Sequence, residues 1–144
     1  MKDLKKSVVG VWRFIISELR SEDGQVTYPD GMHPVGYLIY TEDGYFSVQN
    51  MHGDRDRHAT NDLHTGTAEE KLAAYNSFFC CCGKYDLFDE GVIHHIEVCL
   101  FPNWIGSDQV RYLKFEGNRM FLSTPPIPVS GKMQTAHLIW ERAN

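Results

Sequence analysis

The run from His94 to Glu97 brings together the side chains best suited to proton transfer in this chain of 144 residues. In an extended strand alternate side chains share a face, so His95 and Glu97 would lie side by side while His94 points the other way. A carboxylate raises the pKa of a neighbouring imidazole or orients its ring, and such a pair can move protons near neutral pH. His94, His95 and Glu97 are therefore the candidate catalytic residues. For His95 and Glu97, a solvent-exposed polar pair is the alternative.

His94 falls on the more apolar face of its segment, where we expect it to lie beside Tyr40 and Tyr112. One imidazole with two phenols in an apolar pocket can orient the polar group of a ligand or shuttle a single proton. A hydrogen-bonded histidine of the hydrophobic core is the alternative that needs no ligand.

Other kinds of site receive little support from residue spacing. Histidines and aspartates crowd residues 51–66, yet they match no established metal-ligand pattern. Three adjacent cysteines, 80–82, would spread round the axis of a helix rather than share one zinc ion. The nucleophile elbow, the phosphate-binding loop and the dinucleotide fingerprint are all absent. We therefore expect no metal ion and no cofactor.

Short segments rich in β-branched and aromatic residues must position these side chains. Tight turns at residues 42–44, 89–91 and 117–118 separate several of them, which is typical of antiparallel hairpins. Closing such a meander into a barrel removes its exposed edges, so we predict an all-β, antiparallel up-and-down barrel of eight or nine strands. The expected strands cover residues 8–19, 35–41, 45–50, 83–88, 92–101, 110–116, 119–124 and 135–142, with a weaker one at 25–28.

One helix is predicted to interrupt the strands, at residues 68–82. Thr67 and Glu70 have the spacing of a capping box, and good helix formers follow them. Leu72 and Tyr75 then recur at helical spacing on one face, which we expect to pack on the barrel wall or across its mouth. Gly83 provides a stop signal.

Strand alternation separates the interior of the barrel from its surface. One set of alternate positions is mostly apolar and is assigned to the interior, with Ile16 and Asn50 included. The opposite set contains Ser17, His95, Glu97 and Arg111, which are better suited to water. Trp104 follows a strand end and is expected at the barrel rim. The predicted ligand-binding residues are Trp12, Phe14, Tyr40, Phe46, Val48, His94, Ile96, Val98, Trp104, Tyr112, Met120, Leu122 and Trp140.

Size and charge limit the possible partners. A chain of 144 residues is one ordinary domain, expected to span residues 1–144, and is long enough to bury a core. Its net charge of −5 disfavours nucleic acid as a partner, because nucleic-acid binding needs a basic surface. No run approaches the roughly 18 apolar residues of a membrane helix, so we expect no membrane association.

The cysteines and the N-terminal segment favour the cytoplasm. Adjacent cysteines rarely bridge one another, and three of them in an oxidising compartment would invite mispairing. Arg13 interrupts the first apolar stretch before it reaches the length of a secretory signal. A cytoplasmic location is therefore the prediction.

Several stretches of the chain resemble the stand-alone lipocalin-like domain proteins of bacteria and fungi. Gly10-Val11-Trp12 is similar to the Gly-x-Trp signature of lipocalins, and Arg142 is placed to act as their Trp-stacking arginine. The resemblance, which extends over residues 8–142, implies a small barrel with an internal apolar cavity. Some of these proteins are similar to cyclases or isomerases of secondary metabolism. The more specific stretches are VGYLIY (35–40), GYFSVQ (44–49), LFPNW (100–104) and LSTPP (122–126).

Three functions from different classes are compatible with these observations. The leading hypothesis is binding of a small hydrophobic molecule in the barrel cavity, with His94 and Tyr112 holding its polar group. The second is an isomerase or cyclase acting on a polyketide- or terpenoid-like metabolite in the same cavity. The third is a filled barrel that acts as a protein-interaction module.

Overall fold

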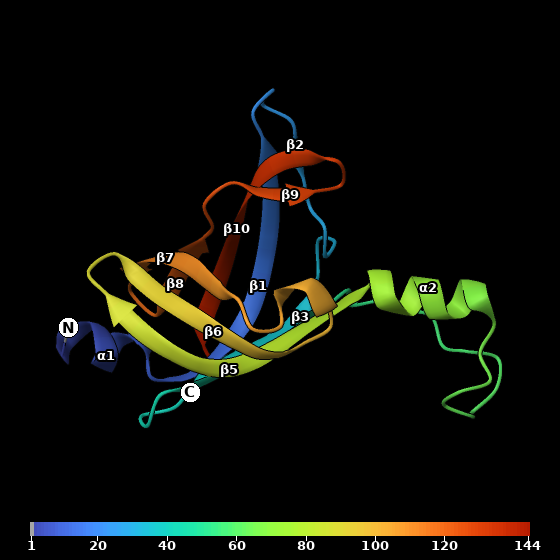
Figure 1. The fold of residues 1–144 in the computed structure, drawn as a ribbon, viewed down its shortest axis with the longest axis horizontal. Coiled ribbons are helices and arrows are strands. Elements are labelled where there is room, and N and C mark those ends of the chain that lie inside the picture. Colours follow the sequence, from blue (N-terminus) through green and yellow to red (C-terminus); the bar gives the residue numbers. More distant parts are fainter. Residues whose placement is uncertain (1) are drawn as a thin grey trace.

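The computed structural model describes residues 2–144 and contains a closed antiparallel barrel (Figure 1). The barrel closes because the first strand pairs with both the second barrel strand and the last strand of the chain. The predicted fold class is therefore confirmed. The eight barrel strands are β1 (Gly10–Ser21), β3 (Val35–Tyr40), β4 (Tyr45–Met51), β5 (Phe78–Phe88), β6 (Gly91–Cys99), β7 (Asp108–Glu116), β8 (Arg119–Ser123) and β10 (Lys132–Arg142).

Two short strands extend the sheet beyond the barrel. Strand β2 (Val26–Thr27) pairs with the end of β1, and β9 (Ile127–Val129) pairs with the start of β10. Both lie at the upper end of the molecule in Figure 1, away from the N-terminus.

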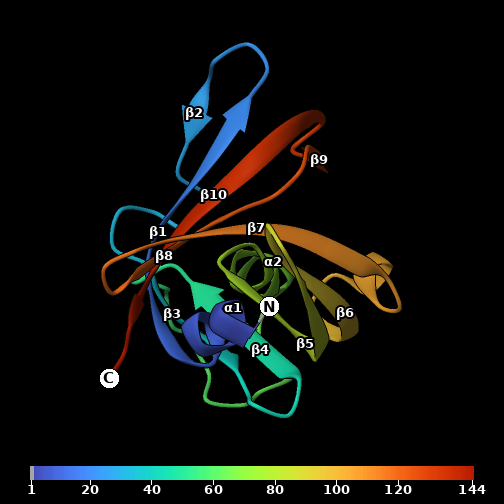
Figure 2. The same ribbon diagram turned by 90° about the vertical axis from the view of Figure 1, so that its left-hand side faces the viewer.

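A short helix that the sequence did not predict, α1 (Lys2–Val8), covers one end of the barrel (Figure 2). Val8 is fully buried, and the indole Nε1 of Trp12 donates a hydrogen bond to its carbonyl oxygen at 2.9 Å. The guanidinium of Arg142 lies 4.1 Å from the ring centroid of Trp12 and donates to the carbonyl oxygens of Ser7 and Val9 at 2.6 and 2.5 Å. The expected Trp-stacking role of Arg142 is confirmed, and the same side chain also fastens the end of α1.

The predicted helix at residues 68–82 is too long. Helix α2 (Ala68–Asn76) begins at the predicted capping box but ends before the cysteines. Cys80, Cys81 and Cys82 instead belong to β5 and pair with β4, and they are free thiols. Gly83 marks a bulge rather than a helix stop: a Cβ there would clash with the carbonyl oxygen of His95, so a side chain does not fit.

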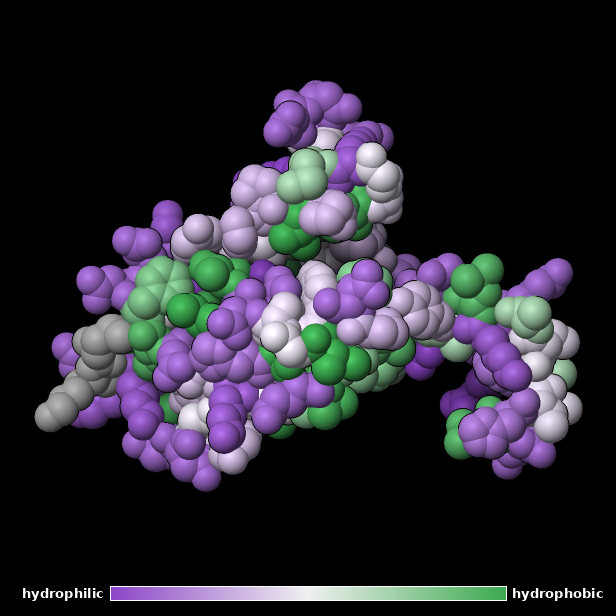
Figure 3. All heavy atoms as spheres, in the orientation of Figure 1, coloured by the Kyte–Doolittle hydropathy of each residue, from purple (hydrophilic) through white to green (hydrophobic). Residues whose placement is uncertain are grey.

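Helix α2 does not cover the barrel, contrary to the prediction from its spacing. Together with the segment before it, the helix forms an arm that extends away from the barrel, visible at the right of Figures 1 and 3. Leu72, expected to pack, is 62% exposed, and Tyr75 is also exposed. Within residues 2–144, no helix is long and apolar enough to cross a membrane.

The predicted faces are reversed in two strands, by a bulge in β1 and by the opposite phase of a regular alternation in β7. A bulge in β1 between Phe14 and Ile16 turns Ile16 outward and brings Ser17 into the interior. In β7 the inward positions are Arg111 and Leu113, which are buried, whereas Tyr112 is 39% exposed. The expectations for Ile16, Ser17, Arg111 and Tyr112 are therefore wrong.

Val98 is a third correction. The pairing of β6 with β7 ends at His95, so the far end of β6 has no β7 strand beside it. Val98 is 58% exposed there and does not face the interior as predicted.

Candidate ligand-binding cavity

The interior of the barrel is filled at the α1 end and hollow in its other half. The hollow part is a cavity of about 190 Å³. Phe14 stacks on Trp140 at a centroid distance of 4.7 Å, and of this pair only Trp140 lines the cavity. The predicted residues that fill the closed half are buried but do not line the cavity; they are Trp12, Phe14, Tyr40, Phe46 and Met120.

The cavity wall joins predicted residues with others that sequence reasoning missed. The predicted members share an inward position on their strands or, for Trp104, a place at the rim; they are Val48, His94, Ile96, Trp104, Leu122 and Trp140. Half of the missed members are polar or thiol-bearing: Ser17, Asp30, Asn50, Cys81, Arg111 and Thr124, of which Asn50 is predicted inside but not in the site. Leu38 and Leu138 add apolar surface.

His94 is a neutral, buried part of this wall. Its Nε2 atom is 2.8 Å from the hydroxyl oxygen of Tyr40, and its ring stacks on Phe46 with a centroid distance of 3.9 Å. Burial, and to a smaller extent the nearby Arg111 charge, lowers the pKa of His94 to about 3. Tyr40 is the partner that the sequence predicted, whereas Tyr112 lies outside and cannot take part.

Arg111 is the most unusual residue of the wall. Its side chain is almost fully buried, with the residue 8% exposed, yet no carboxylate within residues 2–144 lies within 4 Å of it. Its guanidinium donates one hydrogen bond, to the carbonyl oxygen of Val110 at 2.7 Å, and lies over the ring of Trp104 at 5.5 Å. Burial lowers the pKa of Arg111. Buried charges are normally paired, so an unpaired one points to a role beyond stability.

A carboxylate occupies a separate position on the wall. The Oδ2 atom of Asp30 accepts a hydrogen bond from the Ser17 hydroxyl at 2.7 Å, and the Asn50 amide donates to both carboxylate oxygens at 3.2 and 3.3 Å. The β1 bulge is what turns Ser17 toward this group. The cavity therefore has a cation and a carboxylate that do not neutralise each other directly.

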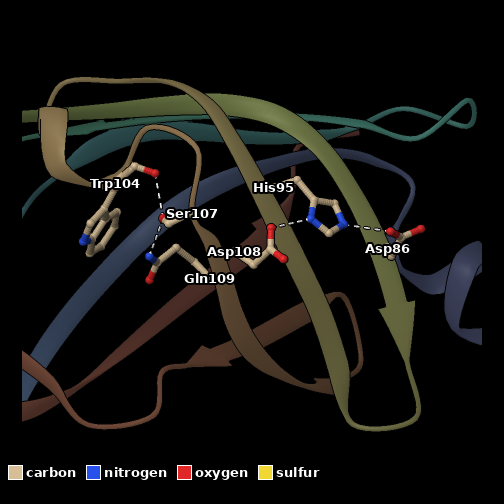
Figure 4. Close-up of polar contacts among 6 residues, drawn as sticks. All are labelled: Asp86, His95, Trp104, Ser107, Asp108 and Gln109. Atoms are coloured by element: carbon tan, nitrogen blue, oxygen red, sulfur yellow. Dashed lines mark hydrogen bonds and ion pairs between the residues drawn. The ribbon is translucent and has the colours of Figure 1, made fainter.

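Trp104 lies at the rim, as predicted, on the short helix η1 (Pro102–Trp104). The Ser107 hydroxyl donates to the Trp104 carbonyl oxygen at 2.6 Å, and the Gln109 amide donates to that hydroxyl at 2.8 Å (Figure 4). Phe79 meets the indole edge-on at 5.6 Å. These contacts hold the indole against the guanidinium of Arg111.

His95 lies on the outer surface and is not part of the cavity. Its Nδ1 atom is 2.7 Å from Asp108 on β7, and its Nε2 atom is 2.7 Å from Asp86 on β5 (Figure 4). Glu97 is exposed and contributes no hydrogen bond to His95 among those of residues 2–144, so the predicted His95–Glu97 pair is wrong. The observed trio joins three adjacent strands across the sheet.

The Asp86–His95–Asp108 trio predicts a stability that depends on pH. Hydrogen bonding to Asp108, and then to Asp86, raises the pKa of His95 in the folded protein. The contribution of protonated His95 to the free energy of unfolding is therefore complete below the pKa of an unfolded histidine, about 6.5. This contribution is lost as the pH rises through the pKa of His95 in the folded protein. Because these side chains are largely exposed, we expect His95→Gln to lose only about 0.5–1 kcal/mol at pH 5.5 and almost nothing at pH 9, measured by urea unfolding. An equal loss at both pH values would contradict this assignment.

The described residues contain no evident metal-binding cluster. Within residues 2–144, no group of three or more histidine, cysteine, aspartate or glutamate side chains is arranged to hold an ion. None of the histidines of the 51–66 segment lines the cavity, although the Nε2 atom of His52 is 2.6 Å from the carbonyl oxygen of Pro29, which does.

A larger hollow, of about 1030 Å³, lies on the outer face of the wall formed by β1, β7, β8 and β10. Its lining mixes apolar Ile16 and Ile139 with charged Glu18, Arg20 and Lys114. Ligand sites are typically concave, mainly apolar and provided with a few convergent polar groups. The interior cavity meets this description better, despite its smaller volume.

A closed eight-stranded barrel with one plugged end and an internal cavity defines a barrel of the kind that holds one small ligand. Residues 9–143 match the family model described as a lipocalin-like domain, and the chain belongs to this family. The match agrees with the resemblance found in the sequence. The 4'-hydroxy-3'-methoxypropiophenone carrier protein of Aspergillus oryzae is 30% identical over 105 residues, which cover 67% of this chain and 95% of the relative.

Proposed function

We propose that this protein binds and carries a small hydrophobic molecule containing a single aromatic ring. The observation that carries the proposal is the cavity of about 190 Å³ inside the barrel, because an engineered cavity of about 150 Å³ is sufficient to admit benzene. The volume therefore suits one ring with a few substituents. The molecule in the name of the Aspergillus relative, 4'-hydroxy-3'-methoxypropiophenone, is a single-ring aromatic ketone, which supports this size class.

The state of the predicted catalytic residues favours a carrier over an isomerase or cyclase. With a pKa lowered to about 3, His94 is a weak base at neutral pH, and its Nε2 atom is already engaged by Tyr40. His95 and Glu97 point away from the cavity. A neutral imidazole is well suited to hydrogen bonding with a bound molecule. The presence of a cavity likewise favours binding over a filled interaction module.

Filling the cavity should weaken ligand binding without disturbing the surface. Ala136 lines the cavity, and Ala136→Leu adds three carbon atoms to a space of about 190 Å³. In isothermal titration calorimetry with acetophenone, a neutral single-ring ketone, we expect the wild type to bind. We expect Ala136→Leu to bind about tenfold more weakly or worse, because overpacking at a filled site typically costs about 1–3 kcal/mol.

Ala73→Leu provides the matched control, because Ala73 is exposed on α2 in the arm. This variant should bind acetophenone like the wild type, and thermal melts should show both variants folded. Unchanged affinity in a folded Ala136→Leu variant would contradict binding in the interior cavity.

A further inference from the structure

Arg111 gives the hollow half of the barrel a positive charge that no ion pair within residues 2–144 balances. The titratable side chains that face it are Tyr40 on β3, Cys81 on β5 and His94 on β6. Burial raises the pKa of both Tyr40 and Cys81 and keeps His94 unprotonated, so all three are neutral near pH 7. The Asp30 carboxylate on the same wall is held by Ser17 and Asn50 and forms no ion pair with Arg111.

The guanidinium of Arg111 also keeps N–H donors that are not used by other groups of the described residues. The central carbon of this group lies 5.5 Å from the ring centroid of Trp104, a contact that uses the positive charge but none of its N–H donors. Only one hydrogen bond from the guanidinium, to Val110, is formed within the described residues. The Nδ1 atom of His94 likewise has no hydrogen-bond partner there, and His94 lines the same cavity.

We propose that the cavity selects a ligand whose aromatic ring carries an acidic oxygen, a carboxylate or a phenolate, and that Arg111 binds this oxygen. This proposal rests on the proposed carrier function and specifies the chemical class of its ligand. The parallel N–H groups of an arginine match the two oxygens of a carboxylate, and a single phenolate oxygen accepts from the same donors. Trp104 acts as a positioning residue that holds the guanidinium at the rim of the space.

An oxygen anion in this position would be recognised mainly through its charge. Hydrogen bonds to a charged group contribute more than neutral ones, and the Arg111 side chain is buried. We therefore expect an anionic ring compound to bind about 10- to 100-fold more tightly than a neutral compound of the same shape.

Two pairs of probes separate charge from shape. Benzoate and benzamide are nearly isosteric, and only benzoate is an anion. For the phenolate arm, 4-hydroxyacetophenone ionises at high pH, whereas 4-methoxyacetophenone cannot. By isothermal titration calorimetry with the wild-type protein, we expect benzoate to bind more tightly than benzamide. We expect 4-hydroxyacetophenone to gain affinity as pH rises through its own pKa, while the methoxy compound stays constant.

Three arginine variants assign the preference to one side chain. Arg111→Met removes the charge but retains an apolar chain, and we expect it to bind benzoate and benzamide equally while still binding acetophenone. Arg111→Lys retains the charge without the planar fork, so part of the preference should remain. Arg13→Met is the matched control, since Arg13 is exposed on the outer face of β1 and its loss changes the net charge equally.

The outcomes distinguish this inference from the proposed function. A preference for benzoate alone assigns the carboxylate, and a pH-dependent gain for 4-hydroxyacetophenone alone assigns the phenolate; either one supports the proposal if Arg111→Met abolishes it. Equal binding of charged and neutral probes, or a preference that persists in Arg111→Met, overturns the inference but leaves the carrier function intact. Failure of all probes to bind, including acetophenone, overturns both.

Discussion

Gly10→Ala is expected to destabilise the protein by about 2–4 kcal/mol. Gly10 has a φ of +134°, a region that side chains rarely adopt, and an added Cβ would clash with the Nη1 atom of Arg142. Backbone strain of this kind amounts to about 1–3 kcal/mol. Displacing Arg142 would also weaken its bonds to Ser7 and Val9, which fasten α1 over the end of the barrel. Urea unfolding of wild type and variant measures the difference.

Two further variants separate strain from contact at this position. Gly44 also has a positive φ, of +99°, but a Cβ added there would have nothing within 4 Å, so Gly44→Ala should be less destabilising than Gly10→Ala. Arg142→Met should itself lose about 2–3 kcal/mol through the charged hydrogen bonds and the Trp12 contact. Because Gly10→Ala and Arg142→Met disrupt the same contact, their combined effect should fall short of the sum. If the two losses of stability simply add in the double variant, Gly10 is required only for its backbone conformation and not for its contact with Arg142.

Arg111→Met is expected to stabilise the ligand-free protein by about 1–3 kcal/mol. Removal of a buried charge that lacks a partner eliminates its desolvation penalty, and Met fills much of the same volume. Loss of the hydrogen bond to Val110 and of the contact with Trp104 offsets part of this gain. Stability that increases when a binding residue is removed is typical of functional sites. Thermal and urea unfolding, both without ligand, provide the measurement.

The matched control for this prediction is again Arg13→Met on the outer surface, for which we expect a change within about 0.5 kcal/mol. If Arg111→Met proves clearly less stable than the wild type, Arg111 has a structural role, and the unpaired charge cannot be regarded as reserved for a ligand.

The barrel itself could be predicted from the sequence because its signals are local and repeated. Tight turns and alternating apolar residues appear in nearly every strand, and closure follows from the need to cover the edges. The capping box at Thr67 is equally local and marks the true start of α2. The end of that helix is not a local property. Cys80 to Cys82 are extended because they pair with residues of β4, and no signal within the segment reveals that partner.

The cavity could be predicted only in part, for a similar physical reason. Val48 and Ile96 follow regular alternation and lie on the wall as expected. Ser17 escapes prediction because the bulge in β1 shifts every later side chain to the opposite face. Arg111 escapes it because a charged side chain is expected to face water. Lys114 gives a usable signal, since it shares a face with Tyr112 and indicates that this face of β7 is the outer one.

The most direct test of the central claim locates a bound ring by nuclear magnetic resonance. With acetophenone and the wild-type protein, we predict intermolecular nuclear Overhauser effects from the ring protons to the methyl groups of Val48 and Ile96, which line the interior cavity. Effects to Ile16 and Ile139 instead would place the ligand in the outer hollow. That result, or no effects at a concentration that saturates any site, would contradict an interior ligand cavity.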